Sequence, residues 1–199
     1  MTFEVAGQAY DRFMGRYSSP LAAQLSDYLE VAPGQRALDV GCGPGAWTEH
    51  LVARLGPENV SAIDPSVPFV DACRERLPEV DVRQGTAGSL PYADASFDLA
   101  GACLVVHFMP DPVAGLTEMA RVTRDDGWVG ATVWDLADNR APMAPIWTAM
   151  AEIDPTHPGE RHIPGGSPGQ LQEFLERAGL SDIEIAVMAV TVTHPTFEE

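Results

Sequence analysis

Apolar and polar positions follow two different rhythms along this chain. Short apolar runs are followed by amphipathic stretches of about ten residues, a succession typical of β-strand–α-helix–β-strand units. The apolar runs predict strands at residues 37–40, 59–63, 80–84, 97–106 and 127–136. The amphipathic stretches predict helices that start at Ser19-Pro20 and Asp111-Pro112, together with helices at 47–55, 66–76, 143–153 and 170–178.

Two of the predicted helices share a start signal, a capping side chain followed by proline. Ser19 is predicted as the N-cap with Pro20 at the first helical position, and Asp111-Pro112 repeats the arrangement. A turn at residues 125–127, Asp-Asp-Gly, is predicted to introduce the strand at 127–136. Near the end of the chain, residues 155–169 form a Pro/Gly-rich loop, and the alternation of residues 183, 185 and 187 predicts an edge strand.

This order predicts an α/β fold with a Rossmann-like, doubly wound and mostly parallel sheet, helices on both faces and an incomplete C-terminal strand region. With 199 residues the chain is expected to form one domain, residues 1–199. Within it we expect N-terminal cap helices at 1–30, a ligand-binding core at 36–136 and further helices with a last strand at 137–199. In such sheets ligands bind at the carboxyl ends of the strands, where the strand order reverses.

The stretch ALDVGCGPGAW, residues 37–47, places a glycine-rich turn between a buried strand and a helix. Gly41, Gly43 and Gly45 allow positive φ angles and let a ligand lie against the main chain. With Ala46 the turn also satisfies the looser dinucleotide pattern G-x-G-x-x-G/A. The turn therefore predicts a ligand without identifying it.

Two acidic residues narrow the choice of ligand. Asp64 ends the second predicted strand, where a carboxylate can accept hydrogen bonds from both hydroxyls of a ribose. Asp39, at the start of the glycine turn, would face like charge in a pyrophosphate. A nucleoside that carries an ammonium and a sulfonium group would instead gain from both carboxylates.

Composition limits the classes of partner and cofactor. The chain has 29 acidic and 12 basic residues, all of them Arg, with a net charge of -17, so we expect no nucleic acid and no membrane as a partner. Three cysteines without metal-ligand spacing, and His157 and His162 in a Pro/Gly loop, predict no metal site. A start without a basic or apolar leader predicts a cytoplasmic protein.

Four segments resemble the class I S-adenosylmethionine-dependent methyltransferases. They are ALDVGCGPG, AIDPS, GSLPYADASFD and EMARVTRDDGWVGATVWD, in this order within residues 36–136. The opening AYDRFMGRYSSPLA is similar to the N-terminal cap of the small-molecule branch, which includes quinone-biosynthesis methyltransferases. The resemblance implies S-adenosyl-L-methionine as cofactor and a small, apolar or aromatic methyl acceptor.

The resemblance also implies a set of cofactor contacts. The turn is expected beside the methionine portion with Asp39 near its amino group, Asp64 at the ribose, Thr86 and Ala87 at the adenine, and Cys103 below the sulfur. Where the family most often has an acidic residue, Thr86 offers only a hydroxyl. The expected cofactor-binding residues are Tyr10, Met14, Arg16, Asp39, Gly41, Cys42, Gly43, Gly45, Asp64, Pro65, Thr86, Ala87 and Cys103.

Candidates for the chemistry itself are few, because the cofactor supplies the leaving group. His107, at the end of the fourth strand, is the candidate general base, and a structural role for it is equally compatible with the sequence. Asp135 is a weaker candidate. Met143, Trp134 and Trp147 could line an acceptor pocket, although residues of these types more often belong to the core.

Two other functions are compatible with the same predicted fold. An NAD(P)-dependent oxidoreductase is disfavoured by Asp39 and by the absence of an obvious Tyr and Lys pair. A non-catalytic nucleoside-binding module would keep the ligand and lack the acceptor pocket. The sequence leaves the acceptor and the oligomeric state open.

Overall fold

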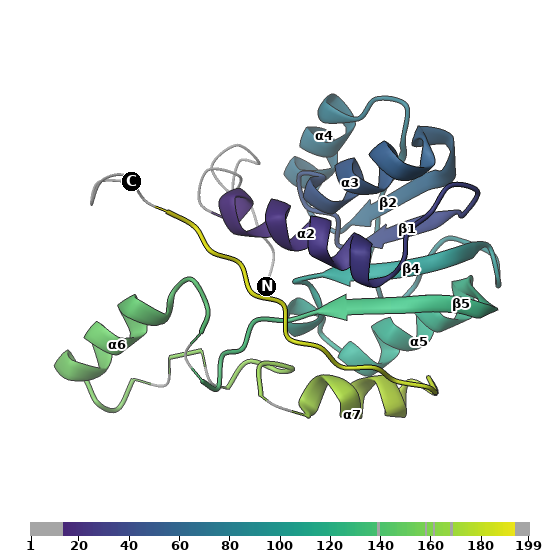
Figure 1. Cartoon of the computed structure of the whole chain (residues 1–199). Helices are drawn as coiled ribbons and strands as arrows, with labels where there is room; N and C mark the ends of the chain where they lie inside the picture. The colour runs from purple at the N-terminus through teal and green to yellow at the C-terminus, as the bar shows by residue number, and fades with distance from the viewer. Residues whose placement is uncertain (1–13, 139, 158, 161, 168, 194–199) are drawn as a thin grey trace.

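A five-stranded parallel sheet forms the centre of the protein (Figure 1). The computed structural model describes residues 14–138, 140–157, 159–160, 162–167 and 169–193. The strands are β1 (Ala37–Val40), β2 (Val60–Asp64), β3 (Asp81–Gln84), β4 (Phe97–Cys103) and β5 (Thr123–Thr132). Their order is β3-β2-β1-β4-β5, and every neighbouring pair is parallel. The strand order reverses between β1 and β4, which confirms the predicted doubly wound sheet.

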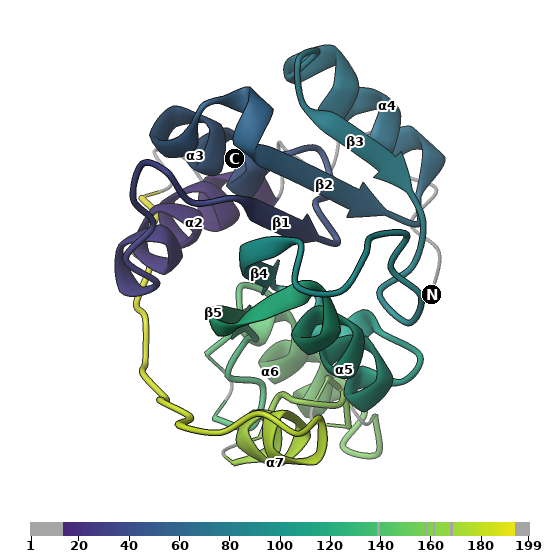
Figure 2. The ribbon, with the colours of Figure 1, turned by 90° about the vertical axis from the view of Figure 1, so that its right-hand side faces the viewer.

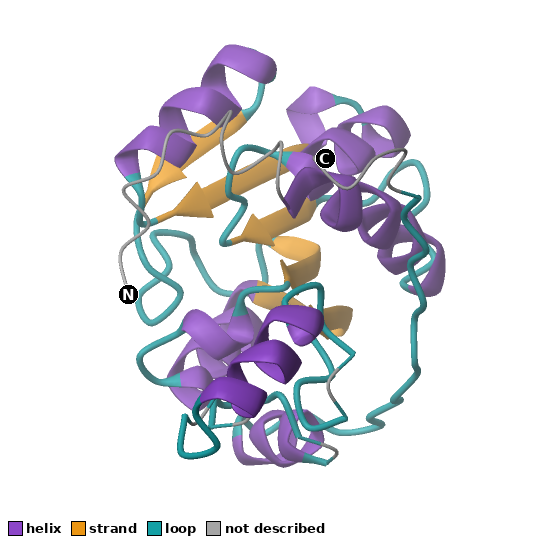
Figure 3. Cartoon of the chain, turned by 90° about the vertical axis from the view of Figure 1, so that its left-hand side faces the viewer, coloured by secondary structure: helices purple, strands orange, loops and turns teal. Residues whose placement is uncertain are grey.

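Helices cover both faces of the sheet, each over its own apolar cluster (Figure 2). One face carries α2 (Arg16–Tyr28), α3 (Ala46–Leu55) and α4 (Val67–Arg76), and the other carries α5 (Pro112–Val122) and α7 (Gln170–Arg177). The short 3-10 helices are η2 (Pro57–Asn59) and η3 (Val106–Phe108). The described helix α6 (Ala144–Ile153) lies in front of the sheet in Figure 3, on the side toward which β4 and β5 point.

The start of α2 differs from the prediction. Gly15 is the N-cap and the helix begins at Arg16, so Ser19 is not a cap and Pro20 lies inside the helix. Pro20 is the fifth residue of α2, so its missing N–H removes one backbone hydrogen bond close to the start of the helix. The predicted apolar face is confirmed, since Leu21 and Leu25 are buried.

The fourth and fifth strands end earlier than predicted. β4 stops at Cys103 because Leu104 has a φ of +62°, which an extended strand does not allow. β5 begins at Thr123 and contains the predicted Asp-Asp-Gly turn as a bulge, where residues 124–127 lie opposite the single residue Asp98. Bulged residues leave the ladder without ending the strand, and this is why a turn sequence occurs inside β5.

The predicted strand around residues 183–187 is not formed. The segment 181–193 runs from α7 to α2 past the edge of β5 without pairing with it (Figures 1 and 2). Ile183 packs against the cluster beneath α5 and α7, while Met188 packs against the cluster beneath α2. Val187, between them, is 89% exposed. Of the three alternating residues only Ile183 is packed, since Ile185 is also 56% exposed, so the alternation does not indicate a buried strand face here.

Candidate functional site

The carboxyl ends of β1, β2 and β4 surround a cavity of about 100 Å³ at the point where the strand order reverses. We call it the switch-point cavity. Its walls come from the glycine turn after β1, the turn after β2, the segment after β4 and one residue of α2. The lining residues are Ser18, Asp39, Gly41, Cys42, Gly43, Pro44, Ala46, Trp47, Asp64, Pro65, Ser66, Phe69, Cys103, Leu104, Val105 and Phe108.

The glycine turn has the open backbone that its sequence predicts. Gly41, Gly43 and Gly45 all have positive φ angles, of +77°, +54° and +95°. A Cβ atom on Gly41 would collide with the side chain of Val105, whereas one on Gly43 would have no atom within 4 Å. The absence of a side chain at Gly41 therefore allows the segment after β4 to pack against the turn. The absence of one at Gly43 leaves open space beside the cavity.

Asp64 is held at the end of β2 by backbone donors. Gly43 N donates to Oδ2 at 2.9 Å and Ser66 N donates to Oδ1 at 2.8 Å. Burial raises the pKa of Asp64, and the two backbone donors act in the opposite direction. Each carboxylate oxygen keeps a further lone pair for a ligand hydroxyl.

Asp39 lies deeper, in the middle of β1, where it is 1% exposed. Its Oδ2 atom accepts a hydrogen bond from Thr48 Oγ1 at 2.7 Å. Burial, with a smaller contribution from Asp64, raises the pKa of Asp39 to about 7. The switch-point cavity therefore has two carboxylates in its wall, and the described residues that line it include no Arg and no His.

The end of β4 is shaped by a strained residue. Leu104 N donates to the backbone oxygen and to the Oγ1 atom of Thr132, at 3.1 and 3.0 Å, and these bonds hold Leu104 in its left-handed conformation. Cys103, just before it, has its pKa raised to about 12 by burial. Cys103 is therefore a neutral thiol at the cavity wall and not a nucleophile.

Seven of the expected cofactor residues line the switch-point cavity and five described ones do not. Thr86 is exposed on the loop after β3, and Ala87 packs beside Gly115. Gly45 is the N-cap of α3, with the Sγ atom of Cys73 against it. Met14 and Arg16 are half-buried at the start of α2 and outside the cavity lining, and Tyr10 lies outside the described residues.

Several lining residues were missed by the sequence analysis. Ser66 caps α4 before a proline-containing first turn, which is a signal that could have identified it. Ser18 and Phe108 reach the cavity from α2 and η3, and no sequence pattern marks them. The sequence does not predict the role of Leu104, because no local pattern indicates a positive φ angle at a leucine.

His107 lies on η3, between two residues that line the cavity, but does not line it itself. It is buried, its ring centroid lies 4.3 Å from that of Phe108, and its Nδ1 atom has no hydrogen-bond partner within the described part of the chain. Burial lowers the pKa of His107 to about 4, so the ring is neutral at pH 7. A neutral imidazole can accept a proton.

The other candidates lie away from the switch-point cavity. Asp135 follows β5, where its Oδ2 atom is 3.7 Å from Arg140 Nη1. Trp147 stacks on His157, with a centroid distance of 5.4 Å, and Trp134 makes an edge contact with Tyr17. Among the described residues, no group of three or more His, Cys, Asp or Glu side chains could hold a metal ion.

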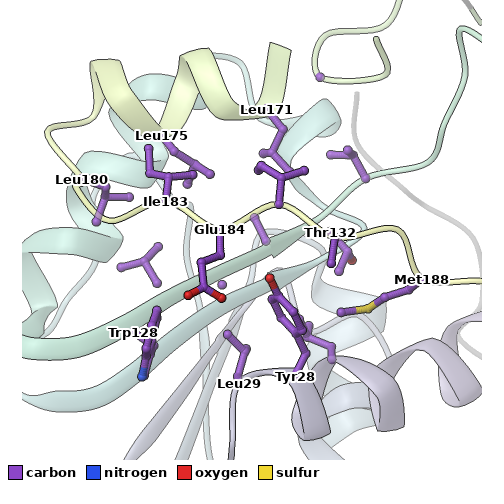
Figure 4. Close-up of a pocket in the computed structure, with 18 of the residues that line it drawn as sticks. Tyr28, Leu29, Trp128, Thr132, Leu171, Leu175, Leu180, Ile183, Glu184 and Met188 are labelled. Carbon is purple, nitrogen blue, oxygen red and sulfur yellow. The ribbon is translucent and has the colours of Figure 1, made fainter. Parts of the chain in front are cut away.

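A larger cavity of about 1110 Å³ lies beside the open edge of β5 (Figure 4). Its walls are α2, α7 and residues 180–190, with Leu171 and Leu175 on one side and Leu29 on the other. It contains none of the expected cofactor residues, and the carboxylate of Glu184 points into it. The larger cavity therefore lies away from the point where the strand order reverses, which is where ligands bind in sheets of this type.

No helix in the described part of the chain is long and apolar enough to cross a membrane.

Known proteins of one class resemble this chain in sequence and in structure. Residues 38–130 match the methyltransferase domain family. Nocamycin O-methyltransferase of Saccharothrix syringae is 30% identical over 92% of this chain and 72% of its own length. Demethylmenaquinone methyltransferase of Lactobacillus johnsonii is 35% identical over 79% of this chain and 72% of its own length.

A solved structure of a SAM-dependent methyltransferase from Aquifex aeolicus has the same fold, with a TM-score of 0.66 at 20% identity over 88% of this chain and 89% of that one. The chain spans only 54% of the length of some other curated relatives. The matched region contains β2, β3 and β4 and most of β1 and β5, and thus every lining residue of the switch-point cavity except Ser18. The chain belongs to the class I S-adenosylmethionine-dependent methyltransferases.

Proposed function

We propose that this protein transfers the methyl group of S-adenosylmethionine to a small apolar or aromatic molecule. The observation that carries the proposal is the pair of buried carboxylates, Asp39 and Asp64, beside a bare glycine turn in a cavity whose described lining has no basic side chain. Such a wall attracts a ligand with positive charge and repels a pyrophosphate. This is also our reason for not favouring an NAD(P)-dependent oxidoreductase.

The residues present fit the cofactor. The open space at Gly43 leaves room for a ligand against the main chain, and Asp64 has free lone pairs toward it. The switch-point cavity, of about 100 Å³, is smaller than the 300–1,000 Å³ typical of ligand pockets, so it would hold only part of the cofactor. We propose that Asp64 holds the ribose, that Asp39 faces the amino group, and that Cys42 and Pro65 border the ligand.

The remaining cofactor contacts are proposals from the family resemblance. Thr86 and Ala87 would meet the adenine, and Cys103 would lie below the sulfur. Tyr10, Met14 and Arg16 would cover the ligand from the N-terminal side. Ser18 adds a hydroxyl in the cavity wall on that same side, which supports a role for this segment.

An apolar acceptor is supported by α6. This helix lies on the side of the sheet where the strands end, and its sequence has one charged residue in ten (Figure 3). Trp134, Met143 and Trp147 are half-buried in the same region. Two relatives carry names that specify small molecules, nocamycin and demethylmenaquinone.

When bound, S-adenosylmethionine supplies a methyl group on a positively charged sulfur. The chain's own residues then orient the two reactants and exclude water, which is the main source of acceleration for an in-line transfer. For an acceptor that must lose a proton, we propose that His107 accepts it, since the ring is neutral and its Nδ1 atom is free within the described structure.

Calorimetry with S-adenosylhomocysteine, the product form of the cofactor, tests the proposal. Asp64→Ala should weaken binding by about tenfold to a thousandfold, because two charge-assisted hydrogen bonds of roughly 1.5–3 kcal/mol each are partly lost. Asp71→Ala, which removes an exposed carboxylate on α4, serves as the matched control and should bind normally. A screen with a labelled methyl group across phenols, quinols and amines should then identify an acceptor.

Absence of S-adenosylhomocysteine binding by the wild-type protein, or tight binding of a dinucleotide in its place, would overturn the proposal. Unchanged affinity in Asp64→Ala would remove the ribose assignment.

A further inference from the structure

The two carboxylates of the switch-point cavity are stabilised very differently. Asp64 has one backbone N–H donor on each oxygen, from Gly43 in the glycine turn and from Ser66 at the start of α4. Asp39 has donors from the single residue Thr48, its hydroxyl at 2.7 Å and, with a smaller effect, its backbone N–H, and the charged side chain that acts on it among the described residues is Asp64, which has the same sign. A carboxylate buried without a cation ionises only at a high cost in free energy.

Among the residues that the structure describes, no cation near Asp39 offsets this cost. The titratable side chains that face it are Asp64 from β2, Cys42 from the glycine turn, Cys73 from α4 and Cys103 from β4. The hydrogen bond with Cys73 and burial raise the pKa of Cys42, whereas the same hydrogen bond lowers the pKa of Cys73. Within the described part of the chain, the remaining group that acts on Asp39 is the neutral Thr48, through its hydroxyl and its backbone N–H. Without a ligand, Asp39 therefore carries a proton up to a pH of about 7.

We infer that cofactor binding displaces the proton of Asp39, so that the affinity of the switch-point cavity rises with pH. The inference rests on the proposed function, which puts the ammonium group of the cofactor's methionine portion beside this carboxyl. The ammonium group is the cation that Asp39 lacks, and it favours the ionised form. The proton leaves to the solvent, and the site then holds two carboxylates against one cationic ligand.

The direction of the pH effect follows from linkage. Below pH 7 the free protein must lose a proton when the ligand enters, so affinity increases by up to about tenfold per pH unit. Above pH 7 Asp39 is already ionised, and the affinity levels off. Between pH 6 and pH 8 the dissociation constant of S-adenosylhomocysteine should therefore fall by about tenfold.

Titration calorimetry at pH 6 in two buffers of different ionisation enthalpy measures the proton directly. Close to one proton should be released for each S-adenosylhomocysteine bound. 5′-Methylthioadenosine, which has the nucleoside without the amino group, should release none. Asp39→Asn should bind S-adenosylhomocysteine without proton release and with no change of affinity between pH 6 and pH 8. Cys73→Ser should still release the proton, which separates Asp39 from the neighbouring thiol.

Equal binding enthalpies in the two buffers would overturn the coupling and leave the proposed function intact. Absence of S-adenosylhomocysteine binding at every pH would instead overturn the proposed function, and the coupling with it.

The protonation of Asp39 can also be tested without any ligand. Because its pKa is raised in the folded state, the folded protein holds this proton more tightly than the unfolded chain does. Its contribution to stability is therefore complete below a pH of about 4 and is lost as the pH rises to about 7. Between pH 5 and pH 8 the Tm of the wild type should therefore fall relative to the Tm of Asp39→Asn, because the asparagine side chain does not titrate. A constant difference in Tm across this range would show that Asp39 is not protonated and would overturn the inference.

Discussion

Two glycines of the same turn differ in what they make possible. Gly41 combines a positive φ with a Cβ position that is blocked by Val105. Gly41→Ala should therefore lower the free energy of unfolding of the ligand-free protein by about 2–5 kcal/mol, the sum of backbone strain and overpacking. Urea denaturation followed by circular dichroism measures this difference.

Gly43→Ala is the matched control. Gly43 also has a positive φ, but a Cβ atom there meets nothing within 4 Å, so only the backbone strain of about 1–2 kcal/mol is expected. An equal loss of stability in both variants would mean that the contact between the turn and Val105 does not matter.

For single residues, the sequence predicted which side chains lie together at the carboxyl ends of neighbouring strands. Asp39, Gly43 and Asp64 come together in the cavity because β1 and β2 are adjacent and parallel. The sequence could not predict Ser18, because its approach depends on how α2 packs on α3. Nor could it show that Asp39 and Asp64 differ in hydrogen bonding, since this depends on the orientation of single N–H groups.

The helices show where a local signal is sufficient and where it is not. At Asp111 the capping prediction is confirmed, because the side chain accepts a hydrogen bond from Ala114 N at 3.0 Å and α5 begins at Pro112. At Ser19 the same signal is wrong, because the chain is already helical from Arg16. The residues before Ser19 had no apolar periodicity strong enough to predict that earlier start.

This difference gives a paired prediction for the two helices. Asp111→Ala should lower the free energy of unfolding by about 1 kcal/mol, the usual value of an N-cap. Ser19→Ala should change it by less than about 0.5 kcal/mol, because Ser19 is exposed and its hydroxyl, 3.4 Å from His50 Nε2, does not cap the helix. Thermal unfolding of both variants beside the wild type measures the two values. A larger loss from Ser19→Ala than from Asp111→Ala would contradict the assigned helix starts.

For the molecule as a whole, the sequence predicted the sheet but not its open edge. The inner strands β1 and β2 are buried on both faces and have nearly continuous apolar sequences, which predict them directly. The edge strand β3 has one buried residue, Val82, and its prediction rests on its place between two helical segments. The alternation at Ile183 and Ile185 has the same appearance as a strand, and periodicity reports which faces are apolar without reporting a partner. The large cavity beside β5 follows from that unpaired segment.

The charge of the whole molecule leads to a last prediction. With a net charge of -17, repulsion among the acidic residues opposes the compact state. Most ion pairs of the described residues, such as Arg54–Asp27 and Arg177–Glu173, lie at the surface and each contribute little, whereas the carboxylates of Asp98 and Glu118 are more buried. Raising NaCl from 20 to about 500 mM shortens the Debye length to a few ångströms. Screening should therefore remove more repulsion than attraction, and Tm should rise by roughly 2–8 °C, equivalent to about 1–2 kcal/mol.

Scanning calorimetry at pH 7.5 measures this shift in Tm. The same series at pH 5, close to the isoelectric point of about 4.4, should give a smaller shift. A fall in Tm with NaCl at pH 7.5 would mean that the surface ion pairs outweigh the excess negative charge.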